Sequence, residues 1–145
     1  MTLLELMFAL AVCVILATVA VSSYGIVVRR MQVSRAVADI GDIQLAIKRF
    51  ELNNGALPDS LADIGMGARQ DPWGIPYQYL NFATATGTGA AKVRKDHNLH
   101  PINTDFDLFS MGPDRDSRAA LTARPSRDDI VRANDGRFIG LAEDY

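Results

Sequence analysis

Four oxygen-bearing side chains in the C-terminal third of the chain are of the types that bind hard metal ions: Ser110, Asp114, Asp128 and Asp129. Ca²⁺ prefers six to eight oxygen ligands at about 2.3–2.6 Å, and a flexible acidic loop can supply them. The same segment also carries four arginines, Arg115, Arg118, Arg124 and Arg127. These arginines could pair with the aspartates and leave no need for a metal. Two interpretations remain open, a calcium site and a solvated loop of mixed charge.

The two histidines of the chain, His97 and His100, lie three residues apart, a spacing that can place both on one face of a helix. A zinc site usually needs three or four ligands, and the single cysteine, Cys13, lies in a distant apolar segment. We therefore interpret these histidines as part of a surface loop. No phosphate-binding loop, nucleophile elbow or pair of catalytic acids occurs at a recognisable spacing, and we expect the protein not to be an enzyme.

Glu5 is the only charged residue among the first 28. A carboxylate at bilayer depth costs about 2.5–3.5 kcal/mol, so such a group is normally paired or held near the interface. It could lie in the headgroup zone, where the positive end of a helix favours it. It could also pair with the free terminal amine of Met1 in a neighbouring copy and set the axial register between subunits. The residues alone leave both interpretations open.

The elements that carry these residues differ sharply in composition along a chain of 145 residues with a net charge of −2. Residues 6–28 form an uncharged, mainly apolar run, long enough for a helix to cross a hydrocarbon core of about 30 Å. A cleavable secretory signal would need a basic segment before this run, and nothing basic precedes Leu6. The isoelectric point of about 5.6 gives no global basic field for binding nucleic acid.

Beyond residue 28 the helical pattern continues, with apolar residues recurring at spacings of three and four. These residues are Val33, Ala36, Ile40, Ile43, Ile47 and Phe50. Asn53, Asn54 and Gly55 form a stop signal, which predicts a first helix from about residue 2 to 53. Alternating or turn-bounded segments predict strands at residues 77–82, 106–110 and 138–141. This order predicts an α+β fold, with one long helix packed on a small antiparallel sheet.

The N-terminal segment Met1-Thr2-Leu3-Leu4-Glu5-Leu6-Met7, followed at once by the apolar run, resembles the mature N-terminus of type IV pilins and type II secretion pseudopilins. Two further motifs, at residues 71–77 (Asp-Pro-Trp-Gly-Ile-Pro-Tyr) and 107–114, resemble the major pseudopilin of type II secretion systems. The resemblance covers residues 1–50 well and these two motifs clearly. Val14 and Ser22 stand where many members carry a helix-breaking glycine and proline.

This resemblance implies a structural role. Prepilin peptidase would remove a short leader and methylate the amine of Met1, and the subunits would pack their N-terminal helices into a filament in which Glu5 neutralises a neighbouring N-terminus. Residues 1–28 would form the transmembrane and filament-core helix in the bacterial inner membrane, and residues 29–145 an exported pilin-like domain in the periplasm or on an extracellular filament. The corresponding acidic loop of the major pseudopilins binds calcium. The partners implied are other copies of the chain, the inner membrane, and the secretion or pilus assembly machinery.

One signal conflicts with the export of residues 29–145, and a different class of function also remains open. Arg29, Arg30 and Arg35 follow the apolar run, and the positive-inside tendency would place them in the cytoplasm unless a removed leader carried its own basic residues. The alternative function is a membrane-anchored module that binds calcium or another ligand as a single copy. Such a lone anchor should tolerate Glu5→Gln, whereas a filament needs the charge.

Overall fold

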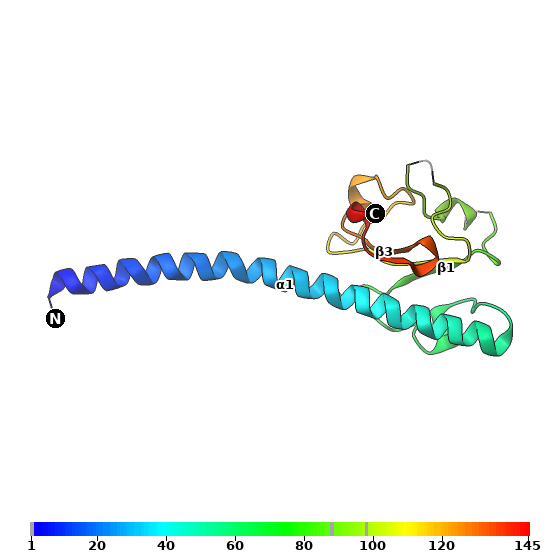
Figure 1. Ribbon diagram of the computed structural model, residues 1–145, viewed down its shortest axis with the longest axis horizontal. Helices are drawn as coiled ribbons and strands as arrows, with labels where there is room; N and C mark the ends of the chain where they lie inside the picture. Colours follow the sequence, from blue (N-terminus) through cyan, green and yellow to red (C-terminus); the bar gives the residue numbers. More distant parts are fainter. Residues whose placement is uncertain (1, 88, 98) are drawn as a thin grey trace. The chain divides into compact units, whose positions relative to one another are not determined.

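The computed structural model describes residues 2–87, 89–97 and 99–145, and in it one long helix packs on a small antiparallel sheet (Figure 1). This arrangement confirms the predicted α+β class. Helix α1 spans Leu3–Asn54. The strands are β1 (Gln78–Asn81), β2 (Phe106–Ser110), β3 (Ile130–Ala133) and β4 (Phe138–Leu141), paired in the order β1-β2-β3-β4. Short 3₁₀ helices lie at Leu61–Ile64, Ala90–Lys92, Arg124–Ser126, Asn134–Gly136 and Ala142–Asp144.

The end of α1 follows from the predicted stop signal. Gly55 adopts a left-handed conformation with φ of 75°, which costs glycine little because it has no Cβ. Its N–H donates to the carbonyl oxygen of Glu51 at 2.8 Å, so the last turn closes on the glycine. The predicted helix boundaries are therefore confirmed to within one residue.

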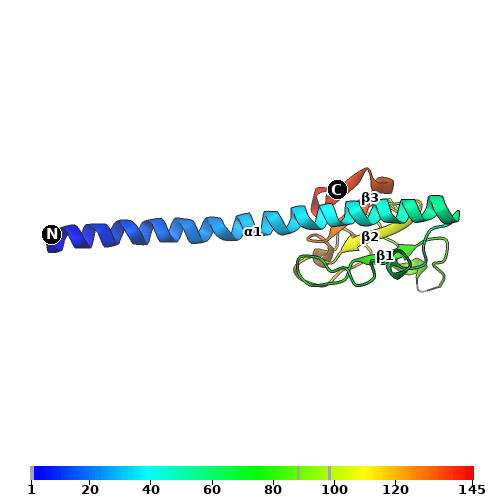
Figure 2. The same ribbon diagram turned by 90° about the horizontal axis from the view of Figure 1, so that it is seen from below.

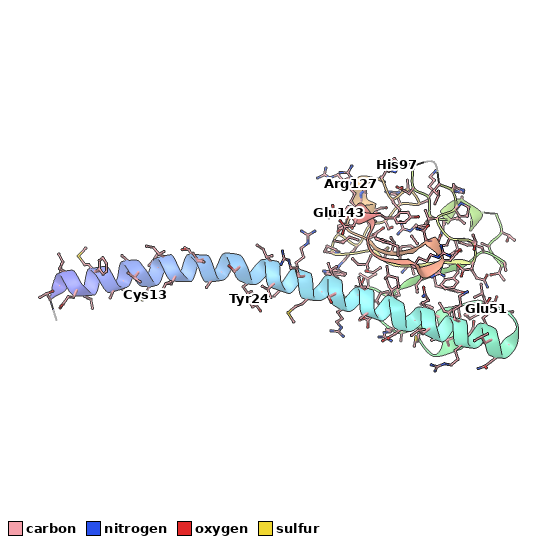
Figure 3. All side chains as sticks on the ribbon, viewed as in Figure 1. Cys13, Tyr24, Glu51, His97, Arg127 and Glu143 are labelled. Atoms are coloured by element: carbon pink, nitrogen blue, oxygen red, sulfur yellow. The ribbon has the colours of Figure 1, made fainter. Side chains whose placement is uncertain are left out.

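The chain divides into two compact units, Met1–Gln32 and Val33–Tyr145, each taken by itself below. In the first unit every described side chain from Thr2 to Val21 is exposed. Figure 3 shows one of these side chains, Cys13, and further along α1 the side chain of Tyr24, which is also exposed. This stretch is long and apolar enough to cross a membrane and could anchor the chain there.

The second unit has its main core between α1 and one face of the sheet. Figures 1 and 2 show the later part of α1 lying along the sheet in both views. The helix contributes four fully buried side chains at the predicted spacing: Ala36, Ile40, Ile43 and Ile47. The sheet contributes Phe106, Leu108 and Ile130, and Val33 packs at the edge of the same cluster. The predicted apolar stripe is thus the helix's buried face, with Phe50 half-buried at its end.

A second, smaller cluster covers the opposite face of the sheet. Its buried members are Ile102, Leu121, Val131, Ala133 and Ala142, with Phe109 and Phe138 packed against them. Strand β3 is therefore covered on both faces, and all four of its residues are buried. The sequence analysis predicted no strand here. A strand buried on both faces lacks the period-two alternation that marks a half-exposed strand.

A buried arginine fastens the sheet to the helix. Arg132 of β3 donates from Nε to Gln44 Oε1 of α1 at 2.6 Å and from Nη1 and Nη2 to the carboxylate of Asp105 at 2.8 and 3.0 Å. Its guanidinium lies 3.9 Å from the centre of the Phe106 ring. Lys48 of α1 donates to the same carboxylate at 3.0 Å. Burial would raise the pKa of Asp105, but the hydrogen bonds from Arg132 and Lys48 outweigh it and lower that pKa.

The motif at residues 71–77 forms a turn that makes a second link to α1. Asp71 is buried and accepts from the backbone N–H groups of Trp73 and Ile75 at 3.0 and 2.9 Å, which holds the turn closed. Tyr77 ends the turn with its ring buried and its hydroxyl donating to Asp39 Oδ2 of α1 at 2.9 Å. Burial and the neighbouring Asp39 raise the pKa of Tyr77, so the hydroxyl stays protonated and keeps this bond at physiological pH.

Candidate functional site

Glu5 is exposed at the start of α1, where it caps its own helix. Its Oε2 accepts from the backbone N–H of Thr2 at 2.7 Å and from the Thr2 hydroxyl at 3.2 Å. In return, Thr2 Oγ1 accepts from the N–H of Glu5 at 3.3 Å. This reciprocal pair is a capping box, and the pattern Thr-x-x-Glu before an apolar run is its sequence signature. The sequence analysis missed that role. The other assembly residue, Met1, lies outside the described residues.

The segment that follows Glu5 presents an apolar surface on all sides. Phe8 is 74% exposed and Val21 75%, and a surface of this kind marks contact with lipid or with other protein. Thr18, a polar interruption, turns its hydroxyl back to the carbonyl oxygens of Val14 and Ile15 at 3.1 and 2.7 Å, so its polarity is satisfied within the helix. The backbone is helical throughout residues 14–24 in the isolated chain. Whether the helix persists in a filament stays a prediction.

The structure places Asp129, a predicted calcium ligand, in a buried ion pair. Its Oδ2 accepts from Arg94 Nη2 at 2.7 Å and from the hydroxyl of Ser117, and both charged side chains are at most 2% exposed. Arg94 stacks 3.7 Å from the centre of the Phe109 ring. Burial raises the pKa of Asp129 to about 6, although Arg94 acts in the opposite direction. Asp129 Oδ1 and Arg94 Nε are buried without a hydrogen-bond partner among the described residues.

Ser110 is turned toward a different partner. It is fully buried, and its hydroxyl donates to Asp71 Oδ2 at 2.6 Å while accepting from the N–H of Gly112 at 3.1 Å. The turn at residues 71–77 and the motif at residues 107–114, which were paired from the sequence only by resemblance, are therefore joined by a hydrogen bond. This bond explains why an aspartate opens one motif and a serine lies within the other.

The remaining two predicted ligands, Asp114 and Asp128, meet through the backbone. The N–H of Asp114 donates to Asp128 Oδ2 at 3.3 Å. Gly112 approaches the same residue so closely that a Cβ added to it would overlap the carbonyl oxygen of Asp128. The loop thus folds back on itself at Gly112, whose φ of 66° also favours glycine.

Taken together, the four predicted ligands do not form one donor set. Asp129 is ion-paired with Arg94, and Ser110 is hydrogen-bonded to Asp71. The backbone N–H of Asp114 donates to the carboxylate of Asp128. Within the described residues, no group of three or more histidine, cysteine, aspartate or glutamate side chains is arranged to hold a metal ion. The residues as placed do not fit a calcium ion, and calcium binding stays a prediction. The arginine that pairs with Asp129 is none of the four named from the sequence.

Those four arginines lie on the outside of the loop. Arg118 approaches Asp116 at 3.6 Å with both side chains more than half exposed, and Arg115 donates to the carbonyl oxygen of Trp73 at 3.4 Å. Exposed pairs of this kind contribute about 0–1 kcal/mol to stability. The buried contacts of the loop are instead those of Arg94, which donates to Asp129, to the hydroxyl of Ser117 and to the carbonyl oxygen of Arg118.

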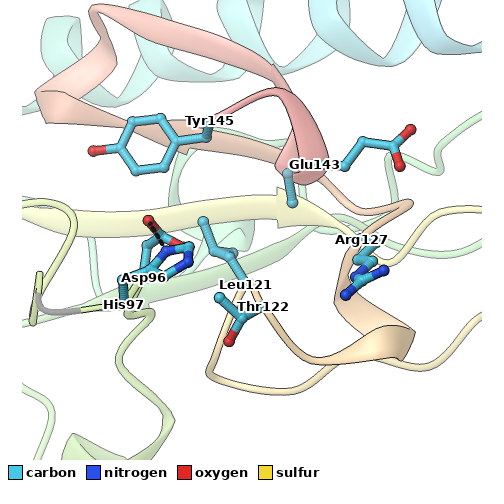
Figure 4. Close-up of a pocket in the computed structure, with 8 residues that line it drawn as sticks. Asp96, His97, Leu121, Thr122, Arg127, Glu143 and Tyr145 are labelled. Carbon is cyan, nitrogen blue, oxygen red and sulfur yellow. Dashed lines mark hydrogen bonds and ion pairs between the residues drawn. The ribbon is translucent and has the colours of Figure 1, made fainter.

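A cavity of about 310 Å³ with a lining of mixed polarity lies beside this loop (Figure 4). Its lining includes Asp96, His97, Arg127, Glu143 and Tyr145, drawn from the 94–100 loop, the 121–127 loop and the C-terminal segment. His97 Nδ1 lies 2.9 Å from both carboxylate oxygens of Asp96, and the imidazole is 76% exposed. The Tyr145 hydroxyl turns away from His97 and donates to Asn134 Oδ1 at 2.8 Å. Adjacent polar groups on an exposed loop are the arrangement expected of a solvated surface.

No protein-family model, curated protein or solved structure matches the chain. Its function must therefore be argued from its own residues.

Proposed function

We propose that this protein is a structural subunit of a helical filament, of the type IV pilus or type II secretion pseudopilus kind. Residues 1–28 would hold the chain in the bacterial inner membrane before assembly and form the filament core afterwards. The second unit would be the exported, pilin-like domain. The assignment to this family rests on the sequence motifs at residues 1–7, 71–77 and 107–114, and the role proposed is structural rather than enzymatic.

One observation carries the proposal. The first unit is a helix with apolar side chains exposed around its surface and a single carboxylate, Glu5, at its beginning. A lipid anchor alone requires only the apolar surface, and an acidic residue in that position adds an insertion cost. Pairing of Glu5 with the amine of a neighbouring copy accounts for the charge and for its place at the helix start. The capping bonds from Thr2 occupy Oε2, and the exposed Glu5 side chain still has Oε1 to offer a neighbour.

The test compares two substitutions at the helix start. Glu5→Ala removes the charge and the carboxylate half of the capping box but leaves the bond from the residue 5 N–H to the Thr2 hydroxyl, whereas Thr2→Ala removes the capping hydroxyl and keeps the charge. Loss of the N-cap hydroxyl in Thr2→Ala costs about 0.5–2 kcal/mol of helix stability. We expect Glu5→Ala to remain in the membrane and to abolish filaments in sheared surface material or in an overproducing strain, as seen by negative-stain microscopy. Thr2→Ala should still assemble.

Each contrary result has a definite meaning. A normal yield of filaments from Glu5→Ala would refute the pairing of Glu5 with the terminal amine of a neighbouring copy. Equal loss in Thr2→Ala would show that capping, and not intersubunit charge pairing, is what assembly requires. If the unmodified chain forms no filaments and Glu5→Gln keeps its function, the alternative stands, namely a single-copy membrane-anchored module that binds a ligand.

A further inference from the structure

Two adjacent arginines, Arg29 and Arg30, follow the apolar run of the first unit, and both side chains are exposed on α1. Neither arginine makes an ion pair or a side-chain hydrogen bond within the part of the chain that the structure describes. A guanidinium carries a permanent charge and five N–H donors, and it binds carboxylates and phosphates through two parallel bonds. The pair is therefore available to an anion outside the chain.

The helix surface around the two arginines is apolar. Met31, which follows them, is 66% exposed, and Val27, which precedes them, is 53% exposed. Tyr24, labelled in Figure 3, is exposed a little earlier on α1. Tyrosine is enriched where a membrane meets water, and the apolar stem of an arginine can lie along acyl chains while its charged end reaches the headgroups. This mixture of side chains is that of a membrane interface.

The distances along α1 agree with this placement. A hydrocarbon core of about 30 Å takes about 20 residues of helix, so a span that begins at Leu6 ends at Gly25. Arg29 and Arg30 then lie about 6 and 7.5 Å beyond the core. The headgroup layer adds about 5–7.5 Å on each side of a bilayer. Both arginines are thus at the level of the lipid phosphates.

The chain itself supplies no carboxylate at this level. Its sequence contains no acidic residue between Glu5 and Asp39. Asp39 is already paired with Arg69 and accepts from the hydroxyl of Tyr77. A neighbouring copy at the same depth in the membrane presents the same sequence, and therefore no carboxylate either. The anion that does stand beside Arg29 and Arg30 in a membrane is the lipid headgroup.

We infer that Arg29 and Arg30 bind the headgroups of acidic phospholipids in the leaflet at this end of the span. The inference rests on the proposed function and deepens it, because it names the lipid class that holds the chain in the membrane before assembly. A headgroup with a net negative charge attracts the arginines more than a zwitterionic headgroup does. Adjacent helix positions point about 100° apart, so the two side chains reach separate headgroups. The pair fixes the depth of the helix, and a chain that leaves the membrane for a filament gives up these contacts.

The test measures the lipid selectivity of the full-length chain in phosphatidylcholine vesicles. Spin-labelled phosphatidylglycerol and spin-labelled phosphatidylcholine, added in separate samples, report by electron paramagnetic resonance the fraction of each lipid held at the protein surface. We expect phosphatidylglycerol to be preferred at least about fivefold, which corresponds to about 1 kcal/mol, the attraction of one arginine near an acidic membrane surface. The preference should weaken in about 1 M salt, which screens charges beyond about 3 Å.

Substitutions locate the site. The double variant Arg29→Gln, Arg30→Gln should bring the ratio of the two lipids close to one. The matched control is Arg49→Gln, which removes an exposed arginine of the second unit that also makes no ion pair within the described residues. This control should keep the full preference. A preference that survives in the double variant, or that is absent from the unmodified chain, would overturn the inference.

The same measurement separates the inference from the proposed function. Equal holding of both lipids by the unmodified chain would refute the arginine site, while the held phosphatidylcholine would still show a membrane span and leave the filament proposal intact. If neither lipid is held, the span does not lie in the bilayer, and the inference fails together with the membrane-held state. A preference that depends on Arg29 and Arg30 in a chain that never forms filaments would support the inference and refute only the filament.

Discussion

Replacing Arg132 tests the link between α1 and the sheet in the second unit. Arg132→Met keeps a similar volume but removes the hydrogen bonds to Gln44, to both oxygens of Asp105 and to the carbonyl of Phe106. Arg132 is 1% exposed and the Asp105 side chain 17%, so the carboxylate loses a buried partner that water replaces only in part. Breaking a buried ion pair on one side costs about 3–5 kcal/mol. Lys48 still lies 3.0 Å from Asp105, so we expect about 3 kcal/mol, at the lower end of that range.

The matched control removes the other cation from the same carboxylate. Lys48 has 41% of its side chain exposed, and Lys48→Met should cost about 0–1 kcal/mol because water replaces the lost contact. Both free energies come from urea unfolding of a soluble fragment starting at Arg29, followed by circular dichroism at 222 nm. Since domains of this size have about 5–15 kcal/mol of stability in total, the two losses are easily distinguished.

The pH dependence gives an independent check. The folded chain lowers the pKa of Asp105, so its contribution to stability is present above the unfolded pKa near 4 and is lost as the pH falls through the lower folded value. Arg132→Met removes part of that contribution, so the gap between variant and unmodified fragment should narrow in acid. Equal losses in Arg132→Met and Lys48→Met, or a gap that stays constant down to low pH, would refute the reasoning.

Further predictions concern the loop around Asp129. Burial raises the pKa of Asp129 to about 6, so between about pH 4 and pH 6 this group should make the fragment less stable as the pH rises. The Asp129→Asn variant should lack that dependence on pH. A contribution of Asp129 that makes the fragment more stable as the pH rises over this range would contradict the raised pKa. With Asp129 held by Arg94, we expect a calcium chelator to leave the melting temperature unchanged, and a fall on chelation would favour the calcium hypothesis instead. Gly112→Ala should cost about 2–4 kcal/mol of stability, from left-handed backbone strain plus overlap of the new Cβ with Asp128. The control Gly74→Ala, at a φ of 83° in open space, should cost about 1–2 kcal/mol from strain alone. Equal losses of stability in the two variants would show that the close contact between Gly112 and Asp128 has no effect.

Features that depend on local pattern were predictable from the sequence. The limits and buried face of α1 follow from a period of three to four residues ended by Gly55, and both are confirmed. The edge strands β1 and β4 follow from alternation and turns. The capping box of Thr2 and Glu5 was equally readable, because its signature spans only four residues.

Features that depend on distant partners were not predictable in this way. Nothing in the run Val93-Arg94-Lys95 indicates that Arg94 is buried against a carboxylate 35 residues further on. Strand β3 was missed for a related reason, because Arg132 interrupts its apolar run. The partners of this arginine, Gln44 of α1 and Asp105 just before β2, lie far from it in the sequence. The calcium site stays a prediction, but its acidic pattern does not show that Asp129 is paired with Arg94 or that Ser110 is hydrogen-bonded to Asp71. Short sequence windows show which residues are acidic but not which cation reaches them.

The link between Gln44 and Arg132 joins residues 88 positions apart, and it has a consequence for how the chain acquires its structure. Helix α1 is local and can form as soon as it is made, but its apolar face from Ala36 to Ile47 finds its cover only when β2 and β3 are present. Contacts this remote in sequence slow folding, because the loop between them must close first. Until residue 133 has emerged, that face is open to wrong partners, a hazard shared by slowly folding chains. A chain truncated before β3 should therefore retain its helix, expose its core face, and aggregate or be degraded.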